Sequence, residues 1–166
     1  FHIEFDVAQL AERVAPLARD FARSAQATDG ERTAAEWFEL GVELEAVAPE
    51  EARAAYERAV AGEPDHADAR VNLGRLLHHE GRLDEAESQY RHVLQQRDHA
   101  LAAYNLALVL EDLGRAGDAL REYARAIATD PELAEAHYTL ARLYEQRGDR
   151  FSALRHFNGY RALMRG

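Results

Sequence analysis

Histidine side chains are the groups of this sequence best suited to binding a metal ion, and there are eight of them. His78 and His79 are adjacent, so on a helix their rings point about 100° apart and cannot easily share one ion. His78 could pair with Glu111 or Glu45 across neighbouring helices, but the sequence contains no His-x-x-x-His spacing. Histidines on a helix surface are usually only solvated, so we predict no metal site and no cofactor.

The other residue types that carry chemistry also lack the arrangement a reaction needs. Thirty acidic side chains guarantee chance neighbours, so carboxylate pairs alone indicate no acid–base catalysis. The absence of cysteine excludes thiol catalysis, disulfides and cysteine-ligated metals. The glycines form no phosphate-binding loop, and Ser24, Ser88 and Ser152 lack a nucleophile-elbow motif. We predict that the chain is not an enzyme.

Composition and charge narrow the class of partner. A hydrophobic content of 47% with 30% charged residues, rich in Ala, Leu, Glu and Arg, indicates a globular and helical chain. The net charge of −10 disfavours nucleic acid and anionic lipid as direct partners, and no apolar run reaches the ~20 residues that span a bilayer. All basic residues are arginine, which we interpret as codon bias of a GC-rich bacterial genome. We expect a cytoplasmic protein.

The elements that position these side chains follow from an internal repeat with a period of 33 to 34 residues. Leucine recurs at Leu40, Leu73, Leu106 and Leu140. The next residue is small in every repeat: Gly41, Gly74, Ala107 and Ala141. Four residues after the leucine comes a large apolar side chain: Leu44, Leu77, Leu110 or Tyr144. These positions, i, i+1 and i+4, form one face of a helix. The small residue is expected to let a neighbouring backbone come close.

A second set of columns predicts a second helix in each repeat. Alanine recurs at Ala52, Ala86, Ala119 and Ala153. Four residues after each alanine comes an aromatic residue: Tyr56, Tyr90, Tyr123 or Phe157. Gly81, Gly114 and Gly148 lie between the two helices, where the first must end in a left-handed conformation. Pro49 is expected to mark this turn in the first repeat, and Pro64 and Pro131 close two of the repeats.

These residues resemble the tetratricopeptide repeat (TPR) family, from Trp37-x-x-Leu40-Gly41 to Ala-x-x-x-aromatic and the closing proline. The resemblance implies an all-α fold, a right-handed α-solenoid of four helix–turn–helix repeats with an N-terminal helical extension. Arg70 and Ala103 depart from it, because they lack the aromatic ring of Trp37. The expected boundaries are an extension at 1–33 and repeats at 34–66, 67–99, 100–133 and 134–166. A generic four-helix bundle is the alternative, but it does not predict the same residue at the same place in every unit.

The two ends of the array carry separate predictions. Residues 1–7 alternate as in a short strand, and 7–26 read as an amphipathic helix that Pro16 should kink. Thr33 and Glu36 match a capping box that starts the first repeat. The first residue, Phe1, suggests a piece of a longer protein. Because the sequence stops within the fourth repeat, its last apolar face needs a polar cap or a partner. We therefore predict a weak homodimer through a terminal face.

In the TPR family the first helices of successive repeats line a concave groove, and the resemblance carries this over to the matching columns. The predicted partner-binding residues are Phe38, Val42, Val71, Arg75, His78, Tyr104, Leu108, Glu111, Tyr138 and Arg142. Asp68, Leu101 and Glu135 lie at the helix starts. Apolar anchors of an extended peptide or a helix would suit this stripe, and Arg75 and Arg142 could take its carboxylates. Alternatively, the tyrosines only pack against neighbouring helices and the arginines are solvated. The lysine-dependent clamp by which some family members hold chaperone tails is not expected, because the chain has no lysine.

Two functions remain open. The first is a scaffold or adaptor that binds a peptide or helix segment of another protein in this groove. The second is a sensory or dimerisation module of a larger bacterial transcription regulator with an upstream helix-turn-helix domain. The second rests on similarity of arrangement alone.

Overall fold

The computed structural model of the chain describes residues 14–16, 19–20 and 32–165, and their regular secondary structure is α-helical. Eight helices follow one another between residues 32 and 165: α2 (Ala34–Leu44), α3 (Pro49–Gly62), α4 (Ala67–His79), α5 (Leu83–Gln96), α6 (Ala100–Asp112), α7 (Ala116–Thr129), α8 (Ala134–Gln146) and α9 (Arg150–Leu163). The all-α repeat fold is therefore confirmed. The strand-like stub predicted at 1–7 lies outside the described residues, as does most of the predicted helix at 7–26.

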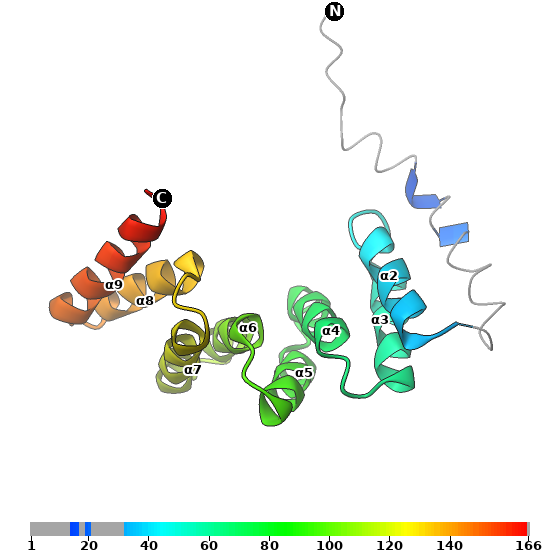
Figure 1. Ribbon diagram of the computed structural model, residues 1–166, viewed down its shortest axis with the longest axis horizontal. Helices are drawn as coiled ribbons and strands as arrows, with labels where there is room; N and C mark the ends of the chain where they lie inside the picture. Colours follow the sequence, from blue (N-terminus) through cyan, green and yellow to red (C-terminus); the bar gives the residue numbers. More distant parts are fainter. Residues whose placement is uncertain (1–13, 17–18, 21–31, 166) are drawn as a thin grey trace, which may run out of the picture. The chain divides into compact units, whose positions relative to one another are not determined.

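The contacts of the chain divide it into two compact units, 1–76 and 77–166, with the boundary inside α4. In the first unit α2 packs against α3. In the second unit α6 packs against α7 and α8 against α9, while α5 also meets α6 and α7 meets α8 (Figure 1). Each of the four predicted repeat spans holds two consecutive helices.

Local sequence signals start the helices. The Thr33 hydroxyl accepts from the Glu36 backbone N–H, and the Glu36 carboxylate accepts from the Thr33 N–H at 2.7 Å, which completes the predicted capping box. Pro49 stands in the first turn of α3, where its missing N–H costs no hydrogen bond.

Among the described residues, no helix is both long and apolar enough to cross a bilayer.

The turns inside the later repeats depend on glycine. Gly81, Gly114 and Gly148 have φ values of 75°, 74° and 79°, the left-handed region that a side chain disfavours. At Gly114 the glycine N–H donates to Glu111 and the next N–H, of Arg115, reaches back to the Leu110 carbonyl, both at 2.8 Å. These two hydrogen bonds satisfy carbonyl groups in the last turn of α6, and the left-handed glycine ends the helix as the sequence predicted.

The repeat columns form the core. Tyr56, Tyr90 and Tyr123 are fully buried, and so are the alanines four residues before them. At Gly41 the close neighbour is the ring of Tyr56 and not a backbone, because a Cβ there would lie 2.5 Å from the Tyr56 Cε1. The small residue of the first helix therefore makes room for the aromatic side chain of the second helix.

Candidate functional site

A polar cluster joins three helices in the first unit around the buried ring of Tyr56. Its hydroxyl donates to the Glu45 carboxylate at 2.8 Å and accepts from the Asn72 amide of α4 at 3.1 Å. Arg75, one turn further along α4, pairs with the same carboxylate. Burial raises the pKa of Tyr56, and the hydrogen bond to Glu45 raises it further. The cluster therefore ties the first helix of one repeat to the first helix of the next.

The same arrangement recurs in the second unit. The Tyr123 hydroxyl of α7 donates to Glu111 at the end of α6, and Arg142 of α8 donates to Glu111 at 3.1 Å. Burial, followed by the bond to Glu111, raises the pKa of Tyr123. Two repeats thus use one tyrosine, one glutamate and the arginine of the following repeat in equivalent roles.

These ion pairs limit how Arg75 and Arg142 can contact a ligand in the way the sequence predicts. Each guanidinium already has an internal carboxylate, so neither is simply solvated. Because their side chains are 38% and 42% exposed and a guanidinium has five N–H donors, each can still reach a second acceptor. Glu111, predicted as a ligand contact, is occupied by Tyr123 and Arg142.

The predicted apolar residues of the first unit differ in how much surface they offer. The Val42 side chain on α2 is 48% exposed. Phe38 is half-buried, with its ring centroid 4.9 Å from that of His66 and 5.9 Å from that of Tyr56. Val71 is buried, at 7% exposed, and so belongs to the packing more than to the surface.

In the second unit, α6 and α8 carry the predicted apolar residues. Tyr104 is half-buried with its ring 5.5 Å from that of Tyr123, and Leu108 one turn later is also half-buried. Tyr138 on α8 is 51% exposed and lies 5.4 Å from the Tyr160 ring of α9. Leu101, at the start of α6, is 50% exposed. The Arg142–Glu111 pair holds α6 and α8 together beside these residues.

The histidines have mainly structural partners. The Nε2 of His78 lies 2.5 Å from an Asp112 oxygen. The Nδ1 of His99 accepts from the Ala102 N–H and so caps α6. His137 and His156 meet between α8 and α9 with their Nδ1 atoms 3.4 Å apart. Within residues 14–16, 19–20 and 32–165, no three His, Asp or Glu side chains are grouped to hold a metal ion.

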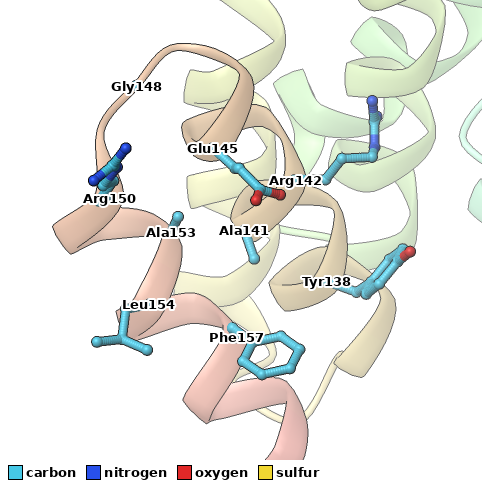
Figure 2. A pocket seen from close by; sticks show the side chains of 9 residues that line it. All are labelled: Tyr138, Ala141, Arg142, Glu145, Gly148, Arg150, Ala153, Leu154 and Phe157. Atoms are coloured by element: carbon cyan, nitrogen blue, oxygen red, sulfur yellow. The ribbon is translucent and has the colours of Figure 1, made fainter.

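The last helix pair carries a pocket that the sequence prediction covered only in part. It is open, has a volume of about 630 Å³ and is lined by Tyr138, Ala141, Arg142 and Glu145 of α8, by Arg150, Ala153, Leu154 and Phe157 of α9, and by Gly148 between them. Figure 2 shows Ala141 facing the Phe157 ring while Arg142 extends away from it. Leu154 and Phe157, which the sequence prediction missed, are 59% and 42% exposed. The sequence feature that could have indicated this pocket is Phe157 itself, because the equivalent residue of each earlier repeat is a tyrosine.

Comparison with known proteins agrees with this repeat architecture. The family model of the tetratricopeptide repeat matches residues 43–100, 91–131 and 104–163. The chain therefore belongs to the tetratricopeptide repeat family. The curated "Tetratricopeptide repeat protein 8" of Caenorhabditis elegans is 39% identical to it in an alignment of 77 residues that covers 43% of this chain and 15% of that protein. The chain thus spans only a small part of this relative.

Several solved structures share the fold. MamA aligns with a TM-score of 0.78 and 18% identity over 99% of this chain and 97% of its own. MamA from Desulfovibrio magneticus, residue 41 to the end, aligns with a TM-score of 0.73 and 19% identity over 96% of each chain. PilW, a type IV pilus biogenesis factor, gives 0.72 and 20% over 95% of this chain and 79% of its own. At these identities the likeness concerns the fold alone.

Proposed function

We propose that the protein is an interaction scaffold without catalytic activity of its own, and that its first helices bind a peptide or helix segment of a partner protein. Proteins of this family generally mediate protein–protein interaction. The observation that carries the proposal is the distribution of exposed apolar side chains. Outside α9 and its C-terminal cap, the large hydrophobic residues exposed among the described residues are Val42, Leu101 and Tyr138, and all three lie on first helices.

The second unit offers the more continuous surface. Leu101, Tyr104 and Leu108 follow one another on α6 at i, i+3 and i+7, which is a single stripe of a helix. Tyr138 of α8 adds an exposed ring, and the Arg142–Glu111 pair supplies charge beside it. We call Leu101, Tyr104, Leu108 and Tyr138 the first-helix surface. Apolar anchors spaced along a helix or an extended strand would fit it, and a ligand carboxylate could share Arg142.

Affinity capture tests this proposal with two matched double variants. Leu101→Ser/Leu108→Ser removes aliphatic contacts from the first-helix surface, whereas Leu120→Ser/Ile127→Ser removes half-buried aliphatic groups from α7. Wild type and both variants are immobilised, exposed to lysate of the source cell, and the retained proteins identified by mass spectrometry. We expect a protein that the wild type and the α7 variant retain and the α6 variant loses. Retention by all three would refute binding through this surface.

A further inference from the structure

The end face formed by α8 and α9 differs from the equivalent faces of the earlier repeats. Tyr56, Tyr90 and Tyr123 are fully buried, whereas Phe157 in the same column is 42% exposed. Leu154 beside it is 59% exposed, and both line the pocket of Figure 2. Ala153 is partly exposed, although Ala52, Ala86 and Ala119 are fully buried. The last repeat therefore presents uncovered the residues that earlier repeats bury.

Two of the earlier faces show what covers such a surface. In the first unit, α4 supplies Asn72 to the hydroxyl of Tyr56 and Arg75 to Glu45. In the second unit, α8 packs on α7 and supplies Arg142 to Glu111. In both cases the cover is an amphipathic helix that brings an arginine to a glutamate at the end of the preceding first helix.

Glu145 occupies the column of Glu45 and Glu111, and it lines the pocket beside Phe157. Its carboxylate is exposed, and the part of the chain that the structure describes places no cation against it. Phe157 has no hydroxyl, so this face, unlike the other two, needs no polar partner for its aromatic residue. The pocket therefore offers the Glu145 carboxylate, the exposed Arg150 side chain and an apolar floor.

We propose that the α8–α9 pocket binds an amphipathic helix of a partner protein, which brings an arginine to Glu145 and packs aliphatic or small side chains against Phe157 and Leu154. The site is separate from the first-helix surface apart from Tyr138 and Arg142, which border both. It supplies a contact of different chemistry, in which a cationic helix covers the α8–α9 face.

A second copy of this chain fits the pocket less well. In head-to-tail stacking its α2 would take the place of the covering helix. Thr139 and Leu143 of α8 are buried, but the equivalent residues of α2 are the exposed Glu39 and Glu43. Arg142 of α8 is replaced by Val42 in α2. A helix with this face would bring carboxylates towards Phe157 and Glu145, on a protein that already carries a net charge of −10.

The probe is a fluorescein-labelled peptide with the sequence of residues 134–146, acetylated and amidated at its ends, because α8 covers the equivalent face in this structure. A second peptide has leucine in place of its Arg142. Both peptides must fold into a helix when they bind, so the free-energy cost of folding cancels in the ratio of their affinities. Fluorescence anisotropy is measured with the complete chain as wild type, Phe157→Ala and Glu145→Arg, each verified as folded by circular dichroism.

We expect the leucine peptide to bind about threefold to fivefold more weakly than the arginine peptide, as for a partly exposed ion pair. Phe157→Ala should weaken binding at least tenfold, because an aromatic anchor is lost. Glu145→Arg should abolish the preference for arginine, and a peptide with glutamate at that place should then bind better than the arginine peptide.

Binding that is unaffected by Phe157→Ala would overturn the proposal, since it would place the peptide elsewhere, for instance on the α6–α7 face by displacement of α8. A concentration-dependent dimer in sedimentation that Phe157→Ala abolishes, without peptide binding, would instead assign the pocket to a second copy. Leu101→Ser/Leu108→Ser should leave peptide affinity unchanged, so failure of the first-helix surface and failure of this pocket are distinguishable.

Discussion

The hydroxyl of Tyr123 is the group through which α7 contributes to the polar cluster of the second unit, and Tyr123→Phe removes it alone. The ring is fully buried and stays in place in the variant. The acceptor, Glu111, keeps its pair with Arg142 at 3.1 Å. The substitution therefore measures one hydrogen bond between a buried phenol and a carboxylate.

A hydrogen bond to a charged group contributes about 1.5–3 kcal/mol. The Glu111 side chain is 20% exposed and retains the guanidinium, so water and Arg142 compensate in part for the lost donor. We therefore expect a decrease of about 1.5 kcal/mol in the free energy of unfolding, at the lower end of that range. For a chain of this size that corresponds to a Tm lower by about 3–6 °C.

Urea unfolding followed by far-UV circular dichroism measures this change, and Tyr104→Phe is the matched control. Tyr104 is a neighbouring, half-buried ring of the same unit, and none of its contacts within the described residues is a hydrogen bond of its hydroxyl. We expect the control to change stability by less than about 0.5 kcal/mol. Equal effects of the two substitutions would refute the role assigned to the Tyr123–Glu111 bond.

The pH dependence gives a second reading of the same variant. Because the pKa of Tyr123 is raised in the folded protein, the unfolded chain loses this proton first as the pH rises. The stabilisation is therefore complete below pH ~10, the ordinary tyrosine pKa, and decreases above it. Wild-type stability should fall more steeply than that of Tyr123→Phe between pH 9.5 and 11.

Three further predictions concern packing, turns and a buried histidine. Gly41→Ala should destabilise by about 1–2 kcal/mol in urea unfolding, because the added Cβ would lie 2.5 Å from the fixed Tyr56 ring and helix propensity offsets only part of the strain. Gly114→Ala should cost about 1–2 kcal/mol through its φ of 74°, whereas Gly117→Ala, within α7 and equally free of neighbours, should stabilise; a loss in both variants would contradict a backbone origin. Burial, then the nearby guanidinium, lowers the pKa of His156, so the unfolded chain binds its proton first as the pH falls. Thermal melts from pH 7.5 to 5.5 should therefore show wild type losing more stability than His156→Gln, and parallel curves would exclude this contribution.

The repeat fold could be predicted from the sequence because its signals are local and occur several times. Gly81, Gly114 and Gly148 mark helix ends by the one conformation that glycine adopts readily, and Thr33 with Glu36 marks a helix start. Each column also recurs at a fixed period, so chance matches in one repeat are rejected by the others. What approaches Gly41 was not predictable in this way, because it depends on the orientation of the Tyr56 ring.

The candidate site was less predictable for a physical reason. Column positions say which face of a helix a residue lies on, but not how deeply a neighbour covers it. Val42 and Val71 occupy the same stripe by sequence and differ from 48% to 7% in exposure. Whether Arg75 is solvated or paired likewise depends on Glu45, which lies thirty residues away. The function as a scaffold, and the regulator module that the sequence leaves as an alternative, both concern partners outside the chain.

The ion pairs nevertheless follow a rule that relates successive repeats. The glutamate column reads Glu45, His78, Glu111 and Glu145, and the arginine column reads Val42, Arg75, Leu108 and Arg142. Arginine occurs where the preceding repeat has glutamate, and leucine occurs where the preceding repeat has His78, which pairs with Asp112 instead. A charge in one repeat is thus matched by the first helix that covers it. Glu145 is the next member of the glutamate column and lines the pocket beside the exposed Phe157, so the same rule predicts that the helix proposed to bind this pocket carries a cation opposite Glu145.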